Sequence, residues 1–150
     1  MTSPAPKPKR PKPLPEWQPT ELRKAAAEAA RSYLIRIIPE KLNILLNKTS
    51  YSDIMIKNAQ ENIAQSINSI NPVMSLVERI GKAGTEYKYF AYIAQRWGSF
   101  KTAWSEKELQ TAASIIKSMI PFVEGQQLID ALVNPKLAPV IASVNDPTLR

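Results

Sequence analysis

Cationic and aromatic side chains alternate at helical spacing near the middle of the chain. Lys88, Tyr92 and Arg96 follow one another at steps of four, so a helix would place them on one face. Tyr89 lies beside them. Such a face can meet phosphates with its charges and a base or sugar with its ring. The alternative is an ordinary solvated face whose tyrosine is half-buried between helices, and the sequence leaves both open.

Further cations flank this face. Arg79 and Lys82 precede it and Lys101 follows it, while Lys24 and Arg31 lie together on the polar side of the first predicted helix. The candidate nucleic-acid-binding residues are Lys88, Tyr92, Arg96, Lys101, Lys82, Arg79, Lys24 and Arg31. The chain has no convincing helix-turn-helix, zinc-finger or RNP-type pattern. We therefore expect contact with a nucleic-acid backbone without base readout.

Few residues are available for catalysis. The chain contains neither His nor Cys, which removes the usual general base near neutral pH and the commonest metal ligand. Composition alone allows a serine–lysine dyad, but no serine lies on a glycine-flanked nucleophile turn, and no glycine-rich phosphate loop is present. The acids are scattered, and the closest pair, Glu106 and Glu108, suits a helix start. We expect a protein that is not an enzyme and has no catalytic residue, metal or cofactor.

Charge and length narrow the class further. The chain has 150 residues, about one domain, and a net charge of +7, which favours polyanionic partners unless it only aids solubility. No signal peptide is visible, and no apolar run approaches the ~20 residues that cross a bilayer. We expect a cytoplasmic protein without a membrane role.

Residues 1–19 differ from the rest of the chain. They hold seven of the thirteen prolines and four cations against one acid. Because proline fixes φ and donates no amide hydrogen bond, we predict a disordered or extended tail or linker here and a helical domain over 20–150. The Pro-x-x-P spacing at Pro8 and Pro11 could instead meet an SH3-like groove.

Apolar residues after this tail recur at spacings of three and four, which predicts helices. Thr20 is a plausible N-cap, and Pro39 should break or kink the first helix. A second segment covers 40–47. Ser50 and Asp53 resemble a capping box for the next helix, which buries isoleucines at 56, 63, 67 and 70.

Proline, glycine and capping residues divide the second half of the chain. Asn71–Pro72 is expected to begin a new short helix, and the helix at 86–97, with Phe90, Ile93 and Trp97 in the core, is expected to end at Gly98. Further expected boundaries are a capping box at Ser105 and Glu108, an interruption at Pro121, a segment at 126–133, a start at Asn134–Pro135 and an end at Asp146–Pro147. Because no alternating pattern indicates a sheet, we predict an all-α fold, a compact bundle of five to seven helices.

The segment Tyr87-Lys88-Tyr89-Phe90-Ala91-Tyr92-Ile93-Ala94-Gln95-Arg96-Trp97, with the basic helical character and the proline-rich start, resembles the small-subunit family of CRISPR effector complexes. Its type I-D version is the most similar: that subunit is made from an internal start in the large-subunit gene. The resemblance implies a non-catalytic subunit of a Cascade complex that functions in antiviral defence. It implies guide RNA and target DNA, other subunits and further copies of itself as partners, and contact with the displaced strand. It assigns no residue.

Two other classes of protein fit the same residues. A free-standing DNA-binding regulator would give a palindromic footprint and dimerise on DNA. A protein–protein adaptor with an incidental basic tail would show no affinity for oligonucleotides at low salt. A membrane-surface role is the weakest, because the tail offers only Leu14 and Trp17 for insertion.

Overall fold

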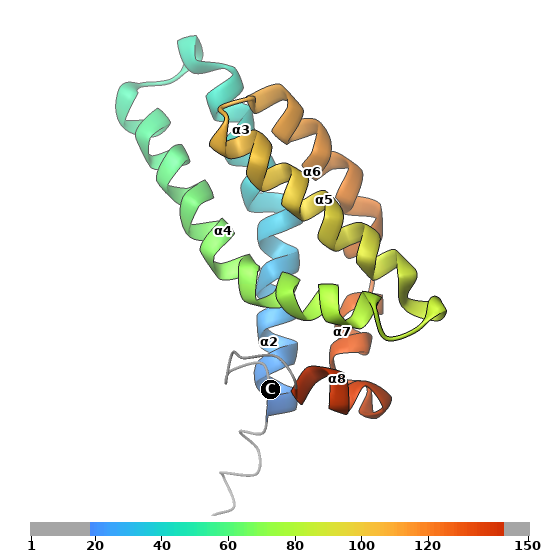
Figure 1. Ribbon diagram of the computed structural model, residues 1–150. Coiled ribbons are helices and arrows are strands. Elements are labelled where there is room, and N and C mark those ends of the chain that lie inside the picture. Colours follow the sequence, from blue (N-terminus) through green and yellow to red (C-terminus); the bar gives the residue numbers. More distant parts are fainter. Residues whose placement is uncertain (1–18, 143–150) are drawn as a thin grey trace, which may run out of the picture.

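Helices make up nearly all of the chain from residue 19 to residue 142, the part that the computed structural model describes (Figure 1). They are α2 (Pro19–Ser32), α3 (Ile38–Leu46), α4 (Asp53–Gly81), α5 (Lys88–Ser105), α6 (Leu109–Val123), α7 (Gln127–Leu132) and α8 (Ala138–Ala142). Between residues 19 and 142 there is no strand, so the predicted all-α bundle is confirmed there. The predicted tail, apart from Pro19, and the predicted end at Asp146–Pro147 lie outside the described residues.

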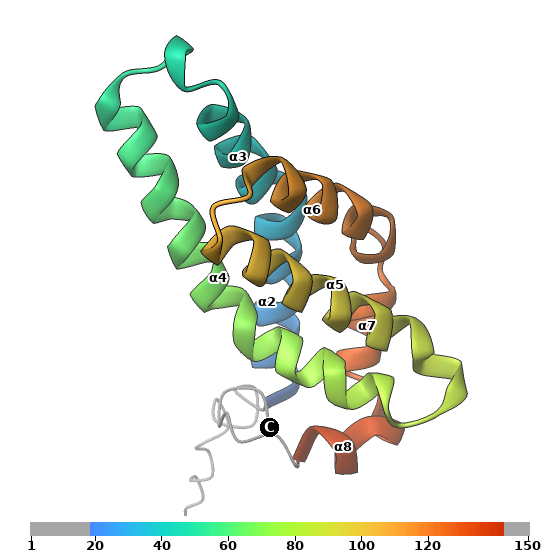
Figure 2. The ribbon, with the colours of Figure 1, turned by 45° about the horizontal axis from the view of Figure 1, so that its top comes forward.

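The long helices pack around one core. α5 lies between α4 and α6, and both of these also contact the rod formed by α2 and α3 (Figure 2). The predicted core stripe of α5 is confirmed, because Phe90, Ile93 and Trp97 are all buried. On α4, Ile63 and Ile70 are buried as well. The bundle therefore has a continuous apolar interior with α5 as one of its outer helices.

Of the break or kink predicted at Pro39, the break is wrong, because the helical chain continues through this residue. A π-helix, Tyr33–Ile37, joins α2 to α3, and Pro39 falls in the first turn of α3. The Ile38 amide donates to the carbonyl of Tyr33, five residues back. This widened turn removes the usual conflict between a proline ring and the carbonyl one turn earlier. The distortion is thus a local change of helix type.

α4 is one helix of 29 residues, and the predicted new start at Asn71–Pro72 is wrong. Pro72 lies inside α4, which bends along its length (Figure 2). The N-cap of α4 is Ser52, whose hydroxyl accepts a hydrogen bond from the Met55 amide at 3.2 Å. Ser50 instead lies in a 3₁₀ turn, Lys48–Ser50, so the predicted capping box is also wrong.

α5 continues past Gly98 to Ser105, so the predicted stop is wrong. It ends in a Schellman motif: the Glu108 amide bonds to the Ala103 carbonyl at 2.9 Å, and the Lys107 amide bonds to the Trp104 carbonyl at 3.1 Å. Ser105 is the last residue of α5, and its hydroxyl donates to the Thr102 carbonyl.

α6 begins and runs differently from the prediction. Glu108 is its N-cap residue and makes no side-chain capping bond, so Ser105 and Glu108 do not form a capping box. Pro121 lies within the helix and does not interrupt it. The predicted segment at 126–133 contains α7, and the predicted start after it is confirmed: the Asn134 side chain accepts a hydrogen bond from the Lys136 amide at 2.9 Å. The 3₁₀ turn Pro135–Leu137 and α8 follow.

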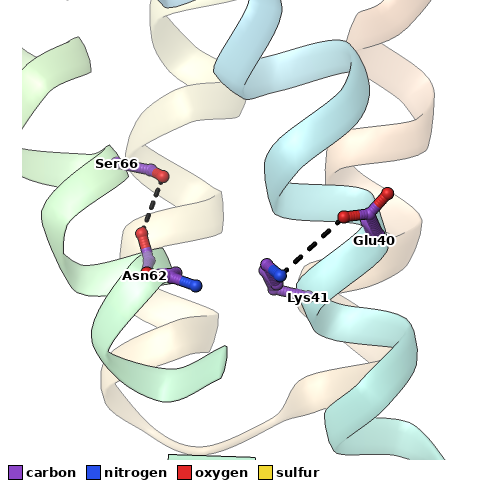
Figure 3. A network of polar contacts seen from close by, with 4 residues as sticks. All are labelled: Glu40, Lys41, Asn62 and Ser66. Atoms are coloured by element: carbon purple, nitrogen blue, oxygen red, sulfur yellow. Dashed lines mark hydrogen bonds and ion pairs between the residues drawn. The ribbon is translucent and has the colours of Figure 1, made fainter. Parts of the chain in front are cut away.

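One buried polar side chain lies between α3 and α4. Ser66 is 1% exposed, and its hydroxyl donates to the Asn62 carbonyl one turn earlier at 2.7 Å. Asn62 projects from α4 on the side where Lys41 of α3 lies, and Lys41 pairs with Glu40 at 3.8 Å (Figure 3). The serine is satisfied within its own helix, so it adds no unpaired polar group to the core.

Candidate nucleic-acid interface

The stripe predicted on α5 forms a seam with α6. Tyr92 packs against Phe122 with ring centroids 5.0 Å apart and planes inclined by 56°. One turn along, the Arg96 Nε donates a hydrogen bond to the Ser118 hydroxyl at 3.1 Å. The two helices run in opposite directions, so steps of four on α5 meet steps of four on α6. We call Tyr92, Arg96, Ser118 and Phe122, together with the exposed Lys88 one turn before Tyr92, the α5–α6 seam.

Both rings of the seam are open to solvent. Tyr92 is 40% exposed and Phe122 is 38% exposed, while Phe90 and Trp97 of the same helix α5 are buried. Tilted aromatic pairs of this kind are favourable and hold their rings in a fixed orientation. The seam therefore presents a pre-formed pair of ring faces and edges at the protein surface.

Cationic groups lie at both ends of Tyr92. Lys88 is exposed one turn before it, and Arg96 lies half-buried one turn after it. Within residues 19–142, Arg96 makes no polar contact beyond its bond to Ser118. The bond through Nε leaves both Nη groups of the guanidinium for an anion, in a side chain already fixed in place.

The remaining predicted cations of the central region do not join the seam. Lys101 lies on the α4 side of α5, where it lines a cleft of about 450 Å³ together with Glu78 and Trp97. Lys82 pairs with Glu78 at 3.9 Å, and both side chains are well exposed. Arg79 is exposed in the last turn of α4. The basic residues are thus divided between two sides of α5.

The two candidates on α2 have different environments. Arg31 is half-buried, and its Nη1 donates to the Gly125 carbonyl at 2.9 Å, in the loop after α6. This bond ties α2 to the end of the helix that carries Phe122. Lys24 is exposed. Arg31 therefore has a structural contact that the sequence did not predict.

Tyr89 lies beside the stripe but is more buried than Tyr92. Its ring lies 4.2 Å from that of Phe90, centroid to centroid. Burial raises the pKa of its phenol, and the Asp130 carboxylate of α7 raises this pKa further. The neutral phenol is the form that this site favours.

Phe122 and Ser118 were missed in the sequence. The predicted interruption at Pro121 separates Phe122 from the helix that holds Ser118, whereas both residues lie on one continuous α6. A continuous α6 paired antiparallel with α5 would have indicated them, because their spacing of four mirrors that of Tyr92 and Arg96.

No group of three or more Asp or Glu side chains able to hold a metal ion occurs in the part of the chain that the structure describes. None of the helices between residues 19 and 142 is long and apolar enough to cross a bilayer. Comparison of the chain with protein-family models, with curated proteins and with solved structures finds no match.

Proposed function

We propose that this chain binds nucleic acid through the α5–α6 seam, as a non-catalytic subunit of a cytoplasmic CRISPR RNA-guided complex. The observation that carries the binding proposal is the exposed Tyr92–Phe122 pair with Lys88 and Arg96 beside it. The net charge of +7 supports a polyanionic partner. The resemblance of the sequence to CRISPR small subunits supports the identity of the complex.

The seam suits a sequence-tolerant mode of binding. Lys88 and the free Nη groups of Arg96 would neutralise phosphates, and the rings of Tyr92 and Phe122 would contact sugars or bases of an unpaired strand. Neither ring can read a base edge by hydrogen bonding except through the tyrosine hydroxyl. Guide RNA and target DNA, above all its displaced strand, are the partners that fit this mode.

Assembly with other subunits is supported by two exposed apolar residues at the start of α4. Ile54 is 72% exposed and Met55 is 44% exposed, both in the first turn of α4. Large apolar side chains at this exposure are suited to burial against a neighbouring protein surface. Other subunits of the complex, or further copies of this chain, are the proposed neighbours.

The binding proposal is tested by charge reversal on the seam. The double variant Lys88→Glu and Arg96→Glu is titrated against single- and double-stranded oligonucleotides between about 50 and 300 mM salt. Each lost phosphate contact should reduce the slope of log affinity against log salt by roughly one, so a reduction of roughly two is expected. Thermal unfolding of the variant checks that the bundle is intact.

A matched control separates a local contact from the effect of net charge. Lys117→Glu with Lys136→Glu changes the charge equally, and both lysines are exposed outside the seam. The control should retain most of the affinity and the original salt slope. If the control and the seam variant bind equally well, the seam is not the binding surface.

The proposed complex has its own test. A tagged copy purified from its host should carry an RNA of uniform length together with several larger proteins. Purification of the tagged chain alone, or with DNA as a symmetric dimer, would contradict the proposed complex and favour a free-standing regulator.

A further inference from the structure

A second cleft lies where four helical segments end or begin. It is formed by the end of α3 and the following turn, the start of α4, the end of α5 and the start of α6, and its volume is about 570 Å³. Its lining residues are Leu45, Lys48, Gln60, Trp104, Ser105, Lys107 and Leu109. We call it the Trp104 cleft. Its volume falls within the range of pockets that hold small organic molecules.

The lining of the Trp104 cleft combines one aromatic surface with two cations. Trp104 is half-buried, so part of its side chain stays open, whereas Trp97, seven residues earlier on α5, is only 2% exposed. Lys48 and Lys107 are exposed, and no carboxylate belongs to the lining. The carboxylates of Glu106 and Glu108 flank Lys107 in sequence but lie outside it. A planar ring with an anionic group is the ligand chemistry that this set fits.

The backbone of Lys107 supports a role in binding. Lys107 has φ of 61°, and among the described residues no other non-glycine residue has a positive φ. It is the left-handed residue of the Schellman motif that ends α5, a position that glycine usually occupies because it has no Cβ. A strained position that keeps a long side chain is a pointer to function. Lys107 is also one of the residues that line the cleft.

We infer that the Trp104 cleft binds a single nucleotide, with the base stacked on the Trp104 indole and the phosphate held between Lys48 and Lys107. Gln60 is also a lining residue, and its amide would bond to the base edge or the sugar. The ligand could be a free nucleotide or one unpaired nucleotide of a strand, since both offer the same ring and phosphate. The inference concerns a site separate from the α5–α6 seam, so either can fail alone.

Tryptophan fluorescence tests this assignment directly. The full chain carrying Trp17→Phe retains only Trp97, which is buried, and Trp104. It is titrated with AMP, with UMP and with a short single-stranded oligonucleotide bearing a 5′-phosphate. Saturable quenching by the monophosphates and the oligonucleotide indicates a free-nucleotide site, and quenching by the oligonucleotide alone indicates a strand site. Absence of saturable quenching by all three overturns the inference.

Variants of the lining locate the signal. Adding Trp104→Phe should abolish the quenching, and quenching that persists there overturns the inference because Trp97 would be its source. Lys48→Glu should weaken binding by roughly tenfold or more, since a charged hydrogen-bonding group is lost. The seam variant Lys88→Glu with Arg96→Glu should quench normally, which keeps the two sites distinguishable.

Lys107→Gly gives a test in which stability and binding change in opposite directions. Glycine relieves the left-handed backbone, so the Tm should rise by about 2–4 °C. Nucleotide affinity should fall by roughly tenfold, because the ammonium is lost. A variant that is more stable and binds with unchanged affinity would overturn the role of Lys107 in the cleft.

Discussion

The Trp97 indole Nε1 of α5 donates a hydrogen bond to the Asn71 side-chain oxygen of α4 at 2.9 Å. Trp97 is 2% exposed, so this N–H has little access to water. Asn71 precedes Pro72, the residue at which the sequence predicted a helix start. Asn71, which resembles an N-cap in the sequence, thus lies inside α4 and links this helix to α5.

Removing this acceptor should destabilise the bundle. Asn71→Ala leaves the indole N–H without its partner, and we expect a loss of about 1–3 kcal/mol in the free energy of unfolding. Urea denaturation followed by tryptophan fluorescence measures it. Asn68→Ala is the control, because Asn68 is exposed on the same helix and its change should stay within about 0.5 kcal/mol. Equal effects of the two substitutions would contradict this role.

The helical class and the core faces were predictable, because the spacing of isoleucine and aromatic residues directly reflects which face is buried. The boundaries of the helices were less predictable. Pro72 and Pro121 are tolerated inside their helices because tertiary packing on both sides of each proline stabilises the helix. This stabilisation exceeds the cost of the one hydrogen bond that the proline removes. α5 ends at Ser105, and the left-handed position that follows holds Lys107, so no glycine marks this end in the sequence.

The position of the cap of α4 can be tested with two neighbouring serines. Ser52 accepts a hydrogen bond from the Met55 amide, whereas Ser50 lies in the preceding 3₁₀ turn. Ser52→Ala should therefore lower the free energy of unfolding by about 1 kcal/mol. Ser50→Ala should change it by less than about 0.5 kcal/mol. Chemical denaturation of the two variants decides, and a larger effect at Ser50 would restore the capping box predicted from the sequence.

Two glycines should respond to alanine in opposite directions. A Cβ on Gly98 meets nothing within 4 Å, so Gly98→Ala should stabilise α5 by about 0.5–1 kcal/mol. A Cβ on Gly81 would lie 2.5 Å from the Ala91 backbone nitrogen, so Gly81→Ala must push α4 and α5 apart. We expect it to cost about 1–3 kcal/mol. Thermal and urea unfolding give both values, and destabilisation by Gly98→Ala would mean that α5 does not run through that residue.

Only part of the candidate site could be predicted from the sequence. Lys88, Tyr92 and Arg96 share one helix, so their spacing was enough to place them on one face. Phe122 and Ser118 come from another helix, and the pairing of two helices depends on tertiary contacts that one-dimensional spacing does not contain. The same holds for the Trp104 cleft, whose residues come from four segments of the chain.

Tyr89 should make stability depend on pH in the alkaline range. Burial and then the Asp130 carboxylate raise its folded-state pKa above the ordinary value of about 10. The folded state thus holds the phenol proton more tightly than the unfolded state. Its contribution to stability is complete below the unfolded pKa and is lost as pH rises through the folded pKa.

The test compares the wild-type protein with Tyr89→Phe, which cannot ionise. All other ionisable groups are present in both proteins, so their contributions cancel in the difference. The difference in the free energy of unfolding should be constant well below the ordinary tyrosine pKa of about 10 and should change in favour of Tyr89→Phe as the pH rises through that value. Asp130→Asn removes the second cause of the shift, so the alkaline loss should become smaller but not vanish, because burial remains. A difference that does not vary with pH would show that the Tyr89 phenol is as free to ionise in the folded protein as in the unfolded chain.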